Sequence, residues 1–192
     1  MKVTPTALSE VLLIDPEIFT DERGHFAELY HEQRFARHGL PTRFRQQNQS
    51  RSRRGVLRGL HYQLRHPQGK LLWCSRGNVF DVAVDIRVGS PTFGKWAAVE
   101  LSDAKPQLMW VPPGFAHGFC VLSDTADVEY KCTETYVRAD DHGVLWSDPE
   151  LRIEWPLDHP ILSKRDEKLP TLREAAETLP RYTASFRQPA TR

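Results

Sequence analysis

The sequence has no long apolar run, no strong net charge and no paired-cysteine motif. Its early apolar stretch, Val11–Ile14, is far shorter than the roughly 18 residues of a membrane span, and no signal-peptide layout precedes it. A formal net charge of +1 over 192 residues makes no case for a nucleic-acid partner. Three cysteines, an odd number without C-x-x-C spacing, predict reduced structural thiols. We therefore expect a cytoplasmic protein without a membrane or nucleic-acid partner.

Positive charge is nevertheless concentrated in one part of the chain. Six arginines lie within sixteen residues, at Arg43, Arg45, Arg51, Arg53, Arg54 and Arg58. Most are expected to form a solvated face, because runs of charge are usually exposed. At least one of them could hold a phosphate group.

Short strands dominate the predicted secondary structure. Residues 80–88 alternate apolar and polar side chains, which indicates a half-buried strand. Turn residues separate further candidates at Val11–Ile14, Phe26–Tyr30, Phe44–Ser52, Val56–Leu64, Leu71–Ser75, Lys95–Leu101, Gln107–Val111, Gly118–Leu122 and Ala126–Tyr136. Short helices are expected at Glu32–His38 and Thr171–Thr178, and an irregular surface segment at Trp146–Pro160. The pattern predicts one all-β domain over 1–182, a sandwich or barrel, and a loose tail over 183–192.

The segment GVLRGLHYQLRHPQGK, residues 55–70, concentrates candidate chemistry. Arg58 can anchor an anion, His61 can accept a proton near neutral pH, and Lys70 adds a second cation. Arg58 and His61 differ by an odd number, so a regular strand would point them to opposite faces. A bulge at Gly59 would bring both side chains to one face, and this sequence predicts one.

Residues 112–119, PPGFAHGF, resemble the second motif of the cupin superfamily, in which His117 would bind a metal. The partner motif should supply H-x-H and a glutamate. Here His61-Tyr62-Gln63 has Gln63 in place of the second histidine, and no acidic residue lies between Tyr62 and Lys70. Because a catalytic metal generally needs three protein ligands, we expect no metal site.

Two other segments carry weaker signals. Tyr130 and Tyr136 are six residues apart, so one strand would place both on the same side. Two such tyrosines could pack in the hydrophobic core. A tyrosine hydroxyl with cations nearby could instead donate a proton. In DERGHFAE, residues 21–28, Arg23 could meet a phosphate, Phe26 could stack on a base and Glu28 could accept N–H groups.

Taken together, these ordered segments resemble the dTDP-4-dehydrorhamnose 3,5-epimerase family from about Asp21 to Asp166. DERGHFAE, QQNQSRSRRGVLRGLHYQ, PPGFAHGF, YKCTETY, HGVLWSDPELRIEWP and LSKRD carry the resemblance. It implies a double-stranded β-helix (cupin or jelly-roll) barrel with short peripheral helices. It also implies a cofactor-independent epimerase of the dTDP-L-rhamnose route, which inverts C3 and C5 of dTDP-4-dehydro-6-deoxy-D-glucose.

The resemblance assigns roles residue by residue. His61 matches the base, Asp166 the carboxylate that holds it, Tyr130 the proton donor and Lys70 the cation beside the keto oxygen. The matching substrate-binding positions are Arg23, Phe26, Glu28, Gln46, Asn48, Arg58, Lys70, His117, Tyr136, Asp141 and Arg165. Segment 21–28 is expected to cross to the neighbouring subunit of a homodimer.

Two positions depart from the family pattern while keeping their charge. Asp141 stands where the family often has glutamate, and Arg165 stands where LS-x-KD has lysine. These departures put contact detail in doubt rather than activity.

Three rival hypotheses remain open on the sequence. A mono-epimerase acting at C3 or C5 alone can share the same catalytic set. A metal-dependent cupin, such as a dioxygenase or isomerase, is disfavoured by Gln63. A sugar-binding or regulatory cupin without catalysis would leave His61, Lys70, Tyr130 and Asp166 unexplained.

Overall fold

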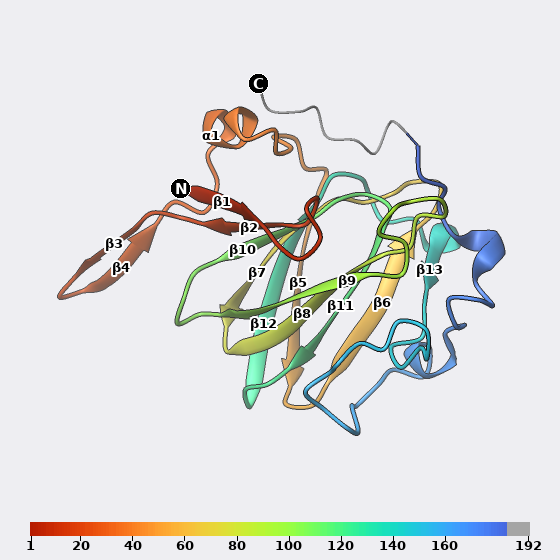
Figure 1. The fold of residues 1–192 in the computed structure, drawn as a ribbon. Helices are drawn as coiled ribbons and strands as arrows, with labels where there is room; N and C mark the ends of the chain where they lie inside the picture. The colour runs from red at the N-terminus through yellow and green to blue at the C-terminus, as the bar shows by residue number, and fades with distance from the viewer. Residues whose placement is uncertain (184–192) are drawn as a thin grey trace.

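Two antiparallel sheets face each other in the computed structural model, which describes residues 1–183 (Figure 1). The six-stranded sheet has the order β1 (Lys2–Pro5), β2 (Leu12–Asp15), β10 (Leu108–Val111), β7 (Lys70–Arg76), β12 (Thr125–Cys132) and β5 (Gln46–Arg53). The five-stranded sheet has the order β13 (Asp141–Gly143), β6 (Leu57–Gln63), β11 (Phe115–Val121), β8 (Asn78–Asp85) and β9 (Trp96–Ser102). The expected all-β jelly-roll barrel is confirmed.

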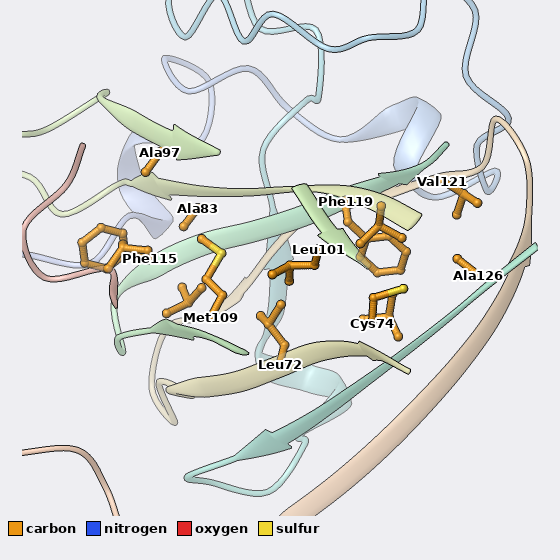
Figure 2. Close-up of a cluster of buried hydrophobic side chains, with 14 of the residues drawn as sticks. Leu72, Cys74, Ala83, Ala97, Leu101, Met109, Phe115, Phe119, Val121 and Ala126 are labelled. Atoms are coloured by element: carbon orange, nitrogen blue, oxygen red, sulfur yellow. The ribbon is translucent and has the colours of Figure 1, made fainter. Parts of the chain in front are cut away.

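Apolar side chains from both sheets fill the space between them. Leu72 of β7, Leu101 of β9, Met109 of β10 and Phe119 of β11 meet in one buried cluster, which Figure 2 shows between the strands. These positions alternate with outward-facing ones along each strand, as a two-sheet core requires.

The C-terminal part of the chain covers the outer face of the five-stranded sheet. Residues 146–160 form no regular helix or strand, as expected, and Leu151, Ile153 and Trp155 pack against that sheet. The strand predicted at residues 80–88 is present as β8 (Asn78–Asp85), but the expectation that it is half-buried is wrong. Strand β8 is buried on both faces, because this segment covers one side while Asp81 faces the barrel interior with an exposed fraction of 0%.

One of the two predicted helices is present. Helix α1 (Glu32–Arg37) matches the expected Glu32–His38. The expected helix at Thr171–Thr178 is wrong, because only a 3-10 turn, η3 (Ala176–Thr178), forms there. Asp148 accepts the Leu172 N–H at 2.6 Å, so tertiary contacts replace helical bonds in a segment too short to be a stable helix alone. No helix among residues 1–183 is long and apolar enough to cross a membrane.

Several strand boundaries differ from the prediction. Strand β12 ends at Cys132, so Tyr136 does not share a strand face with Tyr130. Strand β4 (Gly24–Ala27) pairs with β3 (Ile18–Asp21) and ends before Glu28, so Phe26 and Glu28 share no strand either. The short strands β1, β3 and β13 were not predicted, since three or four residues show little periodicity. Apart from Thr183, the expected loose tail lies outside the described residues.

The predicted bulge at Gly59 is confirmed. In the β6–β11 ladder, His61 pairs with His117 and Arg58 with Phe119, so three steps along β6 match two along β11. Gly59 has a φ of +120°, and a Cβ there would lie 2.6 Å from Gly118 Cα and 2.7 Å from the His117 carbonyl oxygen. Only glycine suits both this backbone conformation and this close approach. The extra residue turns Arg58 and His61 toward one cavity.

We expect Gly59→Ala to destabilise the fold much more than Gly89→Ala. Both glycines have positive φ, but a Cβ at Gly89 meets nothing within 4 Å. Strain alone is expected to cost about 1–3 kcal/mol at Gly89, whereas at Gly59 backbone displacement adds to it. Urea unfolding of the two variants measures the difference. Equal losses of stability would contradict this account of the bulge.

Candidate active site

A cavity of about 450 Å³ opens between the two sheets. Its polar lining comes from both layers: His61 (β6) and His117 (β11) from the five-stranded sheet, Lys70 (β7) and Tyr130 (β12) from the six-stranded sheet. A neighbouring cavity of about 230 Å³ shares His61, Lys70 and Tyr130 and continues to Gln46, Asn48, Gln63, Tyr136 and Asp141. The structure thus gathers the central predicted residues around one polar space.

His61 forms a short hydrogen bond to Asp166, 105 residues further along the chain. The distance from His61 Nε2 to Asp166 Oδ1 is 2.7 Å. Burial would raise the pKa of the Asp166 carboxyl, but the hydrogen bond and charge of His61 and a backbone bond from Gly59 hold that pKa below its usual value. Asp166 is therefore ionised and accepts the proton on Nε2, which leaves Nδ1 with the lone pair that a general base needs.

Lys70 brings a cation into the same cavity. Burial lowers the pKa of its ammonium, while the negative charges of Asp141 and Asp81 oppose that shift. Within residues 1–183 no carboxylate lies close enough to form an ion pair with Lys70. A desolvated cation without a fixed partner can stabilise negative charge that develops on a bound molecule.

Tyr130 faces the cavity from the sheet opposite His61. Burial raises the pKa of its phenol, and the positive charge of Arg58 opposes the shift. The phenol is therefore protonated at neutral pH and can donate a proton. A base and an acid on opposite sides of one cavity can act on opposite faces of a bound ring.

His117 is paired with a carboxylate that sequence reasoning missed. Its Nε2 lies 2.8 Å from Asp81 Oδ1, and Asp81 Oδ2 is buried without a hydrogen-bond partner. Burial raises the pKa of Asp81, although the His117 interactions oppose the shift. The available signal was parity: Asp81 shares its strand face with Val79 and Ala83, which belong to the core between the sheets.

Side chains at the mouth of the second cavity are linked by hydrogen bonds. Tyr136 donates its hydroxyl proton to Asp141 Oδ2 at 2.9 Å, and Gln46 Oε1 accepts the Tyr136 N–H at 2.7 Å. Gln46 in turn donates to Asn48 Oδ1 at 2.8 Å. Arg165 Nη1 lies 2.8 Å from Asp141 Oδ2. Five residues expected to bind substrate thus form one connected rim.

The remaining predicted binding residues divide into two groups. Arg58 lines the larger cavity, and its Nε donates to Ser52 at 3.0 Å. Arg23 and Phe26 do not reach that cavity, because the β3–β4 hairpin projects away from the barrel (Figure 1). Phe26 is 67% exposed, and Glu28 forms a 3.2 Å ion pair with Arg34. Within one chain, therefore, segment 21–28 stays separate from the site.

Potential metal ligands do not cluster in the described part of the chain. No group of three or more histidine, cysteine, aspartate or glutamate side chains within residues 1–183 could hold a metal ion. Gln63, at the position where a metal-binding cupin would have histidine, donates instead to the His66 and Thr135 carbonyl oxygens.

A jelly-roll barrel with a histidine–aspartate pair, a tyrosine and a lysine around one cavity defines a cupin-fold protein with an acid–base site. Comparison with known proteins makes the class more specific. The model of the dTDP-4-dehydrorhamnose 3,5-epimerase family matches residues 5–174. This chain belongs to that family.

Individual relatives are similar over nearly their whole length. The dTDP-4-dehydrorhamnose 3,5-epimerase of Pseudomonas aeruginosa is 51% identical over 170 residues, 88% of this chain and 94% of the relative. A dTDP-4-dehydrorhamnose 3-epimerase of Streptomyces niveus is 45% identical, covering 95% of this chain and 90% of its own. The dTDP-6-deoxy-D-glucose-3,5-epimerase of Legionella pneumophila, solved with dTDP-4-keto-L-rhamnose, superposes with a TM-score of 0.92 at 48% identity, covering 95% and 99% of the two chains.

Replacing Lys70 by methionine is expected to stabilise the fold. The lowered pKa means that the folded state disfavours the charged ammonium, and methionine removes that penalty. We expect Lys70→Met to raise the melting temperature at pH 7 by about 2–4 °C. The gain should narrow as pH rises from the folded-state pKa of Lys70 to its ordinary pKa, above which the wild-type side chain is neutral in both the folded and the unfolded state. Lys131→Met, on the outer face of β12 against Tyr30, is the control and should give no gain; equal gains in both variants would contradict the interpretation.

Proposed function

We propose that this protein inverts C3 and C5 of dTDP-4-dehydro-6-deoxy-D-glucose and produces dTDP-4-dehydro-L-rhamnose. The observation that carries the proposal is the placement of His61 and Tyr130 on opposite sheets across one cavity. Lys70 lines the same cavity from β7, the strand beside that of Tyr130. The similarity to 3,5-epimerases over most of the chain supports the same reaction. An epimerase of this kind is expected in the cytoplasm, in keeping with three free, buried cysteines.

The chemistry follows from the acidity of C–H bonds beside a ketone. His61 Nδ1 takes the proton from C3 or C5, and the electron pair of the broken bond moves into an enolate whose negative charge rests on O4. Lys70 stabilises that oxygen. Tyr130 gives a proton to the same carbon from the opposite face, which forms the new C–H bond and inverts the centre. Asp166 stabilises the imidazolium that His61 becomes, and solvent then restores both groups.

The nucleotide half of the substrate would lie along the rim. Arg58 is placed to meet a phosphate, and Tyr136 is placed to stack on the thymine ring. Gln46, Asn48 and His117 line the two cavities that the sugar and its linkage would occupy. Arg23, Phe26 and Glu28 would complete the nucleotide subsite from another chain.

Proton exchange with solvent tests the reaction directly. Incubation with dTDP-4-dehydro-6-deoxy-D-glucose in D₂O, followed by NMR, should place deuterium at both C3 and C5. His61→Asn should lower exchange at both carbons by at least about 10²–10⁴-fold, the usual contribution of a positioned base. Binding of dTDP should survive. His159→Asn, a surface histidine outside both cavities, is the matched control and should exchange at the wild-type rate.

Tyr130→Phe separates the two proton transfers. Because His61 remains, this variant should still exchange the hydrogens at C3 and C5 for deuterium. The deuterium should return to the face from which the proton left, so neither centre is inverted. Inversion at the wild-type rate in Tyr130→Phe would remove Tyr130 from the proposed role. The absence of exchange in the wild-type protein would overturn the epimerase proposal itself.

A C3-only epimerase is the second candidate. The observation that favours it is the 45% identity to a 3-epimerase, only slightly below the 51% identity to a 3,5-epimerase. The same acid and base serve either reaction, so the cavity residues do not separate the two. Deuterium at C3 without deuterium at C5 would establish this alternative.

We also propose that the protein acts as a homodimer in which each barrel receives segment 21–28 of its partner. The projecting β3–β4 hairpin carries Arg23 and the exposed ring of Phe26 away from its own cavity. An aromatic ring that is 67% exposed on a short hairpin is a candidate for contact with another chain. A two-fold dimer would exchange the hairpins reciprocally.

Subunit mixing tests this shared site. His61→Asn and the double variant Arg23→Ala/Phe26→Ala should each be inactive alone. Half of randomly mixed dimers then contain one intact site out of two, so co-expression should restore about a quarter of wild-type activity. Mixing His61→Asn with Tyr130→Phe is the control. Both substitutions lie in the barrel strands rather than in the exchanged hairpin, so each site of a mixed dimer still carries one inactivating substitution. The absence of restoration in the first mixture would contradict the dimer.

A further inference from the structure

Arg165 is held by the backbone of β13 as well as by a carboxylate. Its Nη1 forms the 2.8 Å ion pair with Asp141, and its Nη2 donates to the carbonyl oxygens of Asp141 at 3.3 Å and His142 at 3.4 Å. These three acceptors engage both terminal nitrogens of the planar guanidinium fork. A lysine ammonium keeps the charge but, opposite Asp141 rather than the longer glutamate that the family often has there, cannot spread its donors over the same three positions.

The contacts of Arg165 with β13 also restrain the His61–Asp166 pair. Arg165 directly precedes Asp166, which is buried and accepts the His61 hydrogen bond. Strand β13 pairs with β6, and Gly143 lies opposite His61 in that ladder. The contacts therefore close a ring that runs from His61 to Asp166, through Arg165 to β13, and back across the ladder to His61.

The chain between Ile161 and Pro170 has few other anchors near the pair. Ile161 is bonded to Gly55 at one end, through a 2.7 Å bond from its N–H, and Pro170 accepts the Leu145 N–H at 2.8 Å at the other. Between them, the side chain of Arg165 supplies the polar contacts to β13, and Leu169 packs against Gly143 of the same strand. Without Arg165, Asp166 would depend on its own contacts with His61, Gly59 and Ser163.

We propose that Arg165 is a positioning residue that fixes the His61–Asp166 pair and so sets the tautomer of His61. Through Asp141 the same guanidinium also holds the hydroxyl of Tyr136, so one side chain joins the nucleotide rim to the proton-transfer pair. The proposal rests on the proposed function for its effect on turnover, but its structural part concerns the resting protein alone.

The test uses Arg165→Lys and a matched control, Arg51→Lys. Arg51 also forms a two-point ion pair, with Asp127 at 2.7 Å for both bonds, but it lines neither cavity. Nitrogen NMR of ¹⁵N-histidine-labelled protein reports which ring nitrogen of His61 carries the proton. In the wild type and in Arg51→Lys, we expect the Nε2–H form alone. In Arg165→Lys, we expect a mixture of both tautomers.

Turnover and binding provide the second measurement. Because loss of position affects chemistry more than nucleotide affinity, Arg165→Lys should lower kcat by roughly 10- to 100-fold and change the Kd of dTDP by less than about 3-fold. Asp141→Asn, which leaves both backbone carbonyl acceptors in place, should shift the tautomer less than Arg165→Lys. It provides a readout even if Arg165→Lys folds poorly.

An unchanged His61 tautomer in Arg165→Lys, with dTDP binding weakened instead, would overturn the proposal and make Arg165 a substrate contact only. A tautomer shift equal in Arg51→Lys would overturn it as well. The NMR measurement needs no substrate. Failure of the epimerase proposal, seen as no exchange in the wild type, is therefore distinguishable from failure of this one.

Discussion

The close contact between Gly59 and Gly118 is the constraint on which the site depends. The bulge that it allows in β6 changes the parity of the strand between Arg58 and His61. Without the extra residue, one of these side chains would point out of the barrel. The same stretch places the Gly59 backbone beside Asp166, so a single irregularity orients His61, Arg58 and the Asp166 carboxylate that His61 contacts.

Charge is distributed unevenly around the cavity. His61 and the His117–Asp81 pair lie on the five-stranded sheet, and Asp166 reaches His61 from the 3-10 turn η2 (Asp166–Lys168). Lys70 and Tyr130 face them from the other sheet. Low surrounding polarity strengthens each of these interactions relative to water. It also raises the pKa of Tyr130, which keeps the phenol protonated, and lowers the pKa of Lys70, so its ammonium is destabilised until negative charge develops beside it.

Much of the fold could be predicted because the strands of seven or eight residues show period-two alternation and turn residues separate them. The predictions failed where the local pattern was weak or tertiary contacts replaced it. Strand β13 has three residues, and the Thr171–Thr178 segment exchanges helical bonds for contacts with Asp148. The burial of residues 80–88 was predicted wrongly for a similar reason. Alternation shows which residues share a face of the strand, but it does not show that a segment seventy residues later covers the outer face.

The sequence by itself determined the candidate chemistry: a histidine between two cations, a tyrosine, the family motifs, and the need for a bulge at Gly59. The family resemblance matched Asp166 to His61, but only the tertiary structure showed that contact and the His117–Asp81 pair. Asp166 is 105 residues from His61, and Asp81 is 36 residues from His117, so neither pair follows from local spacing. Likewise, the three bonds that tie Arg165 to β13 exist because a late loop returns to the edge of a sheet. Local periodicity carries information over a few residues, whereas these contacts depend on how the whole chain packs.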